Sequence, residues 1–229
     1  MNILAVDSCS KILSVSLCKG EEIFTAHTEA GMKHSELVME YVDSVFKKAG
    51  LKPGDLHAVL CMEGPGSFTG LRIGFSVAKG LSLSLSIPFM PVPTLDCIAF
   101  PHKNGLALAA VEAGKGKWYF AVYKDGKIAV PAADANLAQI ENAISKLETD
   151  SKITIAGYSA SSLYNELHQD LKKSLICRER SGGFSQELIT IAKTTDLLDN
   201  YNEAAVCSYP LYIRKTDAEL SLEKTGLVK

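Results

Sequence analysis

The sequence lacks the motifs that would fix a chemical class at once. None of its six cysteines forms a C-x-x-C pair, and its five histidines show neither H-x-x-x-H nor H-E-x-x-H spacing. Those spacings are typical of zinc and redox sites. No Ser/His/Asp or Cys/His set indicates a protease either. The motifs therefore predict no metal site and no catalytic residue.

An excess of one charge and a long apolar run are missing as well. Lys and Arg number 24 against 26 Asp and Glu, a formal net charge of −2, whereas a protein that holds an RNA duplex alone needs clustered cations. The longest apolar stretch, residues 71–85, is interrupted by Arg72 and Lys79 and is a poor bilayer span. No signal-like segment precedes the first strand. We expect a cytoplasmic, reduced protein that contacts no membrane.

What the sequence does contain is alternation between strand and helix periods. The 229 residues suffice for one large domain or two small lobes. Residues 2–6, 12–17, 22–27 and 57–62 have strand character, residues 34–49 repeat apolar side chains at three- and four-residue spacing before Gly50, and a second helix runs from about Thr69 to Leu85. This predicts strand-strand-strand-helix-strand-helix for residues 1–86.

The second half repeats that order of elements. We expect strands at 106–112, 118–123, 127–130 and 153–156, helices at 136–147, 159–171 and 185–198, and an extended piece at 206–214. Two copies of one topology predict a duplicated α/β fold with two lobes, residues 1–100 and 101–229. The proline-rich segment 87–101 is expected to cross between the lobes, and the helix at 185–198 to complete the second lobe.

The most informative stretch is the glycine motif, residues 64–74, which reads GPGSFTGLRIG. Gly64 and Gly66 permit positive φ in a tight strand-to-helix turn, and Ser67 or Thr69 can cap the helix that follows. A glycine loop before a helix is only a weak signal for a phosphate site, and a plain turn explains it better. The loop alone does not decide between them.

The complete string resembles the signature of the TsaB (YeaZ) family, a branch of the actin-like superfold that is also called the ASKHA or RNase H-like fold. Further matches follow in the order expected for that family. They are ILAVDS at residues 3–8, SVSL at 14–17, HSEL at 34–37, AGL at 49–51, DL at 55–56, AKGL at 78–81, IP at 87–88 and PLYIR at 210–214. The resemblance is close over residues 1–100 and thin from there to about 200.

The resemblance implies a function without catalysis. Proteins of this family bind and activate TsaD, the catalytic subunit of the complex that forms N6-threonylcarbamoyladenosine on tRNA, with TsaE as the ATPase. It further implies a homodimer in isolation and access to tRNA through the complex. No cofactor of the chain's own is implied, and ATP or ADP with Mg²⁺ at the junction with TsaD stays open.

The sequence differs from that of its relatives at two sites. TsaD carries a metal-binding His-x-x-x-His after a Pro-Val step, and Thr94 and Ile98 stand at those positions here. Neither replaces a histidine, because a threonine hydroxyl is a poor transition-metal ligand and isoleucine has no donor atom. The family often has Asp-Ala-Arg where this chain has Glu112-Ala113-Gly114, so the role of that arginine does not carry over.

A competing interpretation is a small actin-fold ATPase or kinase that acts through Asp7. Asp7 and Ser8 lie where actin-like ATPases have their first phosphate loop, and an Asp at a strand end orients a magnesium-bound water or caps the strand turn. In this interpretation residues 114–116 form a second phosphate loop, and Gly157 contacts the adenosine. Ordinary turns also explain both segments.

The second helix predicts a docking surface. Leu71, Phe75 and Ala78 form a stripe for the home sheet, Ile73 and Val77 lie on another side, and Gly70 and Gly74 are small enough to let a second helix approach. A central helix of a compact lobe is the alternative, and the family resemblance favours docking. The residues expected to contact the partner are His34, Glu36, Met39, Glu40, Ser67, Phe68, Arg72, Ile73, Ser76, Val77 and Lys79.

Overall fold

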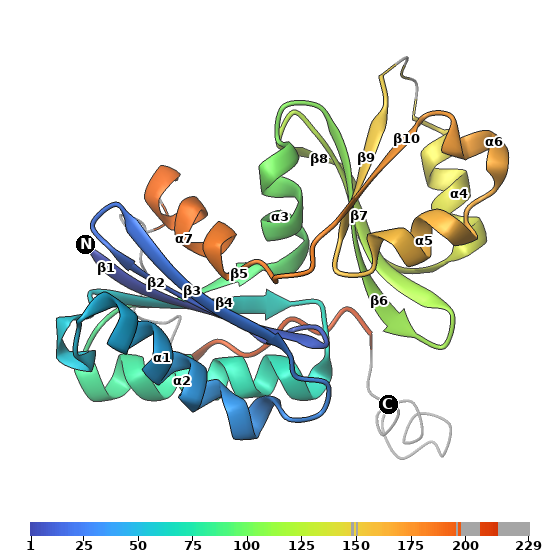
Figure 1. The fold of residues 1–229 in the computed structure, drawn as a ribbon. Coiled ribbons are helices and arrows are strands. Elements are labelled where there is room, and N and C mark those ends of the chain that lie inside the picture. Colours follow the sequence, from blue (N-terminus) through green and yellow to red (C-terminus); the bar gives the residue numbers. More distant parts are fainter. Residues whose placement is uncertain (148, 150, 196, 198–206, 215–229) are drawn as a thin grey trace.

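The chain folds into two lobes, each built around a five-stranded sheet (Figure 1). The computed structural model describes residues 1–147, 149, 151–195, 197 and 207–214. In the first lobe the strand order is β3-β2-β1-β4-β5. Its elements are β1 (Asn2–Asp7), β2 (Ile12–Lys19), β3 (Glu22–Glu29), α1 (His34–Ala49), β4 (Ala58–Gly64), α2 (Phe68–Leu85), β5 (Phe89–Pro93) and α3 (Thr94–Ala99).

The second lobe has the strand order β10-β9-β6-β7-β8. Its strands are β6 (Leu106–Gly114), β7 (Lys117–Lys124), β8 (Lys127–Asn136), β9 (Ile153–Gly157) and β10 (Leu175–Glu179). The helices that follow β8 in the chain are α4 (Leu137–Ser145), α5 (Ala160–Glu166), α6 (Gln169–Lys172) and α7 (Ser185–Thr194).

The two sheets share one topology. β1 pairs antiparallel with β2 and parallel with β4, and β6 pairs antiparallel with β7 and parallel with β9. The order from β3 to β5 in the first sheet therefore matches the order from β8 to β10 in the second. The duplicated α/β fold with two lobes that the sequence predicted is confirmed.

The first two helices begin and end where their sequences predict. α1 stops at Gly50, which adopts φ 64° and returns its N–H to the carbonyls of Lys47 and Phe46; glycine reaches this left-handed conformation without steric cost. Ser67 is the N-cap of α2, where its Oγ accepts a hydrogen bond from the Gly70 N–H at 3.2 Å. Such a cap contributes about 1 kcal/mol.

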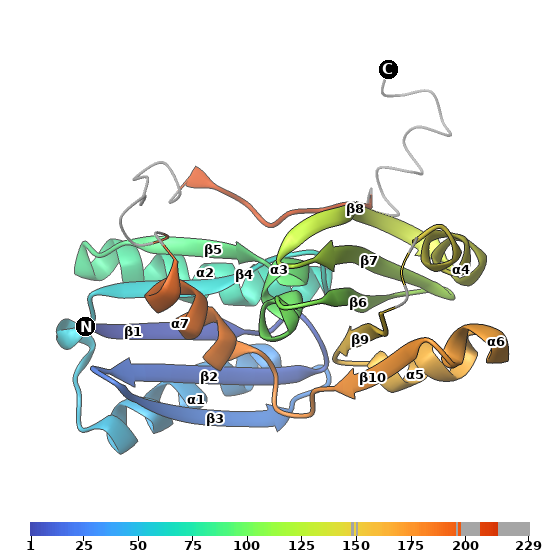
Figure 2. The same cartoon turned by 90° about the horizontal axis from the view of Figure 1, so that it is seen from above.

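Helices cover both faces of the first sheet. α1 and α2 lie on its outer face and α7 lies on the opposite face, whereas α3, which follows β5 in the chain, packs mainly against β6 of the second sheet (Figures 1 and 2). Because α7 packs against β1, β2 and β4, the prediction that this helix belongs to the second lobe is wrong. Leu188 and Ile189 on its apolar side are fully buried. The helical period predicts this apolar side but does not show which of the two sheets it covers.

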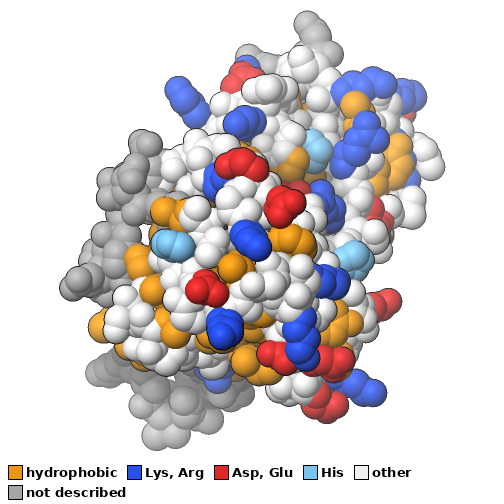
Figure 3. All heavy atoms as spheres, turned by 60° about the vertical axis from the view of Figure 1, so that its left-hand side comes forward, with side chains coloured by type: hydrophobic (Ala, Val, Ile, Leu, Met, Phe, Trp, Pro, Cys, Tyr) orange, Lys and Arg blue, Asp and Glu red, His pale blue; other side chains and the backbone are white. Residues whose placement is uncertain are grey.

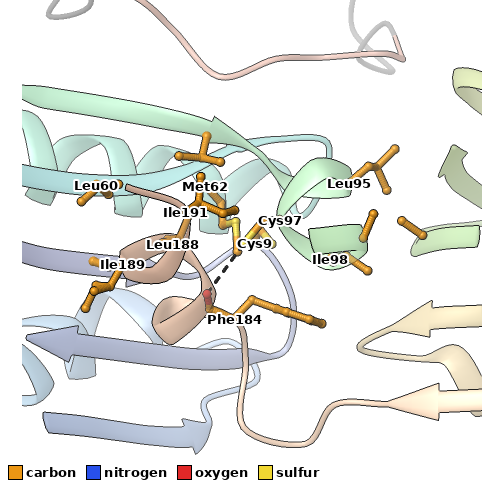
Figure 4. Packing of buried hydrophobic residues seen from close by; sticks show 14 of the residues in the cluster. Cys9, Leu60, Met62, Leu95, Cys97, Ile98, Phe184, Leu188, Ile189 and Ile191 are labelled. Atoms are coloured by element: carbon orange, nitrogen blue, oxygen red, sulfur yellow. Dashed lines mark hydrogen bonds between the residues drawn. The ribbon is translucent and has the colours of Figure 1, made fainter. Parts of the chain in front are cut away.

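A hydrophobic core joins the lobes. Figure 4 shows Leu60 and Met62 of β4, Leu95 and Ile98 of α3, and residues of α7 directed toward one another. Full burial of one such side chain stabilises the fold by about 1.5–3 kcal/mol. Two further cores fill the space between each sheet and its outer helices. Cys9, Cys18 and Cys61 are buried free thiols, as predicted.

Several element boundaries differ from the sequence prediction. The expected crossover at 87–101 contains β5 and α3, since β5 is an edge strand and tolerates Pro91 and Pro93. The helix expected at 159–171 is divided at Leu167 and His168, where the backbone is extended. β10 was not predicted, and β8 extends to Asn136. No helix among the described residues is long and apolar enough to cross a membrane.

Candidate functional site

A cleft of about 1500 Å³ opens between the lobes. Its walls come from the β1–β2 turn, the glycine motif, the β6–β7 turn, the segment after β10 and the C-terminal residues 212–214. Its charged lining has both signs. Lys11, Arg72, Lys115, Arg180 and Arg214 face the cleft together with Glu29, Glu112 and Glu179.

Asp7 lies beneath this cleft and is fully buried. Its Oδ2 accepts hydrogen bonds from the Tyr158 hydroxyl and the Phe184 N–H, both at 2.8 Å, and its Oδ1 accepts one from the Cys9 N–H at 3.3 Å. Burial raises the pKa of the Asp7 carboxyl above its ordinary value, although these hydrogen bonds oppose the rise. The carboxylate therefore holds the second lobe and the start of α7 against β1.

This geometry does not fit a magnesium–nucleotide site at Asp7 and Ser8. Mg²⁺ keeps several waters and needs exposed carboxylate oxygens, whereas both oxygens of Asp7 are occupied by protein donors and Ser8 is buried. The Ser8 hydroxyl donates to the Gly70 carbonyl at 2.8 Å. Among the described residues, no group of three or more His, Cys, Asp or Glu side chains is placed to hold a metal ion.

The glycines of the motif hold the β1–β2 turn. A Cβ on Gly70 would lie 1.9 Å from the Ser8 carbonyl oxygen, one on Gly66 would lie 2.6 Å from the Cys9 carbonyl oxygen, and one on Gly74 would lie 2.7 Å from the Ser8 hydroxyl. The Ser67 N–H donates to the Cys9 carbonyl at 2.7 Å. The prediction that Gly70 and Gly74 admit a partner helix is therefore wrong, because their side of α2 is filled from within the lobe.

The other two candidate loops are turns. Gly114, Lys115 and Gly116 all have positive φ and form the tight turn between β6 and β7. At the position of the family's arginine, Gly114 has φ 69°, and the Nη1 of Arg214 donates to the neighbouring Ala113 carbonyl at 3.4 Å. Gly157, with φ 152°, lies against the Ala110 carbonyl, which a Cβ would approach to 2.1 Å. The positive φ angles of a tight turn explain the first loop, and close backbone packing explains Gly157.

Thr94 and Ile98, at the positions of the TsaD histidines, are fully buried between the lobes. The Thr94 Oγ1 accepts a hydrogen bond from the Gly64 N–H at 3.2 Å, and Ile98 belongs to the core in Figure 4. Their side chains stabilise the fold at the point where α3 leaves β5.

The predicted docking residues lie on α1, on α2 and at the N-cap of α2, and all but one are at least partly exposed. Glu36, Met39, Glu40, Ser67, Phe68, Arg72 and Ser76 are exposed, and Ile73, Val77 and Lys79 are half-buried. His34 is buried, and its Nε2 has no hydrogen-bond partner among the described residues. An apolar seam of half-buried side chains runs along α2 and consists of Ile73, Val77 and Leu81. Half-buried Leu37 and Tyr41 of α1 lie toward β3, where Tyr41 lines a hollow with Thr25, Ala26 and His27.

A C-terminal strap, residues 208–214, runs along α2 and reaches the second lobe (Figure 2). The Arg72 guanidinium lies 3.8 Å from the centre of the Phe68 ring, and its Nε donates to the Tyr212 hydroxyl at 3.1 Å. Lys79 donates to the Ser208 carbonyl, and the Leu211 N–H donates to the Glu63 carbonyl at 2.8 Å. Arg72 and Lys79, two of the residues expected to contact a partner, thus also bind the strap.

Tyr158, Phe184 and Tyr212 are contacts that sequence reasoning missed. Tyr158 follows Gly157, a glycine at a strand end, which is a weak signal for a close approach. Nothing in the local pattern marks Phe184, which leads into α7. Tyr212 lies within the PLYIR match, and only the fold shows that its ring lies 5.0 Å from that of Phe68.

Over the first lobe, in the lower part of Figure 3, basic and acidic side chains are interspersed. This agrees with the near balance of charge in the sequence.

Comparison with known proteins identifies the family. A model of the TsaD family, described as tRNA N6-adenosine threonylcarbamoyltransferase, matches residues 25–219. The tRNA threonylcarbamoyladenosine biosynthesis protein TsaB of Bacillus subtilis is 30% identical over 176 residues, which are 75% of this chain and 76% of the relative. The chain belongs to the TsaB family.

A second TsaB protein matches a shorter region at higher identity. TsaB of Escherichia coli is 36% identical over 129 residues, 54% of this chain and 55% of the relative. Among solved structures, YeaZ from Pseudomonas aeruginosa superposes with a TM-score of 0.75 at 20% identity, covering 92% of this chain and 99% of that one. The family and its duplicated actin-like fold, both expected from the glycine motif, are confirmed.

Proposed function

We propose that this TsaB-family chain is a non-catalytic partner subunit in the formation of N6-threonylcarbamoyladenosine on tRNA. In this proposal it binds and activates a TsaD-like catalytic subunit through α1 and α2. A TsaE-like ATPase joins the complex, tRNA is reached through the complex, and the isolated chain pairs with a second copy. The place of action is the cytoplasm.

The apolar seam along α2 is the observation that carries this proposal. Its side chains are half-buried in the isolated chain, on the face of the first sheet that points away from the second lobe (Figure 1). Covering them with another helix pair removes further apolar surface from water, at about 25 cal/mol per Å². Glu36 and Glu40 are exposed on the neighbouring helix α1, and charges at the rim of an interface set register more than affinity.

The buried state of Asp7 supports a role without catalysis. A carboxylate with three protein donors and no exposed surface has no free oxygen to offer a magnesium-bound water. We therefore propose no nucleotide site at Asp7 and Ser8. If the complex binds ATP or ADP with Mg²⁺, we propose that the nucleotide binds at the interface between this chain and the catalytic subunit.

Titration of the purified chain with a purified TsaD-like subunit tests the proposal. Val77→Glu places a charge in the seam, and burying an unpaired charge costs about 3–5 kcal/mol, so the Kd should rise at least about 100-fold. Ser76→Glu, at an exposed neighbouring position, should weaken binding without affecting the fold. Ile128→Glu, on β8 of the second lobe, is the matched control and should bind like the wild type.

Thermal unfolding of each variant separates loss of binding from loss of folding. If folded Val77→Glu and Ser76→Glu both bind the catalytic subunit with wild-type affinity, α1 and α2 are not the docking surface. ATP titrated into the chain alone, with Mg²⁺, should give no heat of binding, and tight binding there would favour the ATPase interpretation.

A further inference from the structure

The strap places a cluster of exposed aromatic side chains beside α2. Tyr209, Leu211 and Tyr212 are 78%, 42% and 37% exposed, and Phe68 of α2 is 38% exposed. The rings of Phe68 and Tyr212 lie 5.0 Å apart, with the Arg72 guanidinium over Phe68. We call Phe68, Arg72, Lys79, Tyr209, Leu211 and Tyr212 the strap patch.

The strap patch has the composition of an interface centre. Binding energy concentrates in Tyr, Trp and Arg side chains held rigidly in place, and aromatic residues and Arg are enriched at interfaces. Here the two strap anchors, from Leu211 to Glu63 and from Lys79 to Ser208, fix the backbone on both sides of Pro210, which is buried. The exposed rings therefore lose little conformational freedom when a partner covers them.

The charges of the patch select the kind of partner. Arg72 and Lys79 give it two cations, and it contains no carboxylate. The nearby Glu63 carboxyl is half-buried. A symmetric dimer centred here would bring these cations against their own copies, since a two-fold contact joins identical surfaces, and like charges in contact disfavour association. The patch thus fits a different protein with an apolar surface bordered by carboxylates.

We propose that the strap patch is a second half of the docking surface, and that the catalytic subunit covers it together with α1 and α2. This inference rests on the proposed function, because the patch continues from α2, whose residues Phe68, Arg72 and Lys79 belong to both surfaces. The C-terminal strap is then a binding element as well as a brace between the lobes.

Tyr209→Ser tests this inference without disturbing the fold, because Tyr209 is the most exposed ring of the strap. The Kd of this variant for the purified catalytic subunit should rise about tenfold or more. In a separate titration, added NaCl should raise the Kd of the wild-type chain, because salt screens Arg72 and Lys79. Ile128→Ser, a matched loss of an exposed apolar side chain that is 62% exposed on β8, should leave the Kd unchanged.

The outcomes separate the two proposals. Wild-type affinity of Tyr209→Ser, when Val77→Glu no longer binds, overturns the inference and leaves the proposed function standing. Wild-type affinity of both variants overturns the proposed function and the inference together. A changed monomer–dimer equilibrium of Tyr209→Ser, with unchanged binding of the catalytic subunit, identifies a second copy as the occupant and also overturns the inference.

Discussion

Gly70→Ala should destabilise this protein, although the same change in most helices is favourable. An exposed helical Gly→Ala substitution stabilises by about 1 kcal/mol. At Gly70 the new Cβ would lie 1.9 Å from the Ser8 carbonyl oxygen, and ordinary contact begins at 3.4 Å. Either α2 or the β1–β2 turn must move by about 1.5 Å, and overpacking of this kind costs about 1–3 kcal/mol or more.

Hydrogen bonds of the β1–β2 turn bring the expected loss of stability in Gly70→Ala to the upper end of that range. Ser8 also donates to the Gly70 carbonyl at 2.8 Å, and the next residue, Cys9, accepts from Ser67 at 2.7 Å, so a shift of the turn weakens both hydrogen bonds. We expect a net loss of about 3 kcal/mol, which lowers the Tm by about 6–12 °C for a chain of this size.

Gly80→Ala is the matched control on the same helix. Gly80 is exposed, and its Cβ would meet nothing within 4 Å, so this variant should gain about 1 kcal/mol. Urea unfolding followed by circular dichroism measures both variants. If Gly70→Ala proves as stable as Gly80→Ala, close packing does not explain the glycines of the motif. A role of these glycines in ligand or partner binding would then have to be tested.

Asp7 gives three further predictions. Asp7→Ala removes the acceptor for two buried donors, on Tyr158 and Phe184, and should lower the free energy of unfolding by about 2–5 kcal/mol, measured in urea; a loss below about 1 kcal/mol would refute the role as an inter-lobe tie. Since burial raises the pKa of Asp7 above 3.8, the folded chain keeps the proton to higher pH than the unfolded chain. Asp7 therefore lowers the free energy of unfolding as pH rises from about 4 to its folded pKa, and Asp7→Asn should lack that component when urea midpoints are compared from about pH 4 to pH 7. The purified chain with Mg²⁺ and ATP should release phosphate at the background rate, and a brisk rate that disappears in Asp7→Ala would contradict the non-catalytic reading.

Local patterns were enough to predict most helices and strands and the duplication. The period of residues 34–49 with Gly50 behind them fixes α1, and Ser67 ahead of an apolar run fixes the start of α2. These features depend on neighbours within one or two turns. The edge strand β5 was missed because Pro91 and Pro93 read as a linker, although an edge strand needs fewer N–H donors.

Features that depend on distant contacts did not follow from the sequence. The spacing of Gly70 and Gly74 shows that something approaches α2 closely, but the neighbour is the β1–β2 turn of the same lobe. The period of α7 defines an apolar side without naming the sheet that it covers. The contacts between Tyr212 and Arg72 join residues 140 positions apart. Most of the expected docking residues are exposed, as a helical pattern can predict, but their contact with a partner stays a prediction.

The central claim is that this chain serves tRNA modification by docking through α1 and α2. Depletion of the protein from cells that encode it, followed by nucleoside analysis of bulk tRNA, tests that claim most directly. We expect that N6-threonylcarbamoyladenosine disappears, that the wild-type chain and Ile128→Glu restore it, and that Val77→Glu does not. An unchanged level of the modified nucleoside after depletion would show that the chain is not needed for this modification.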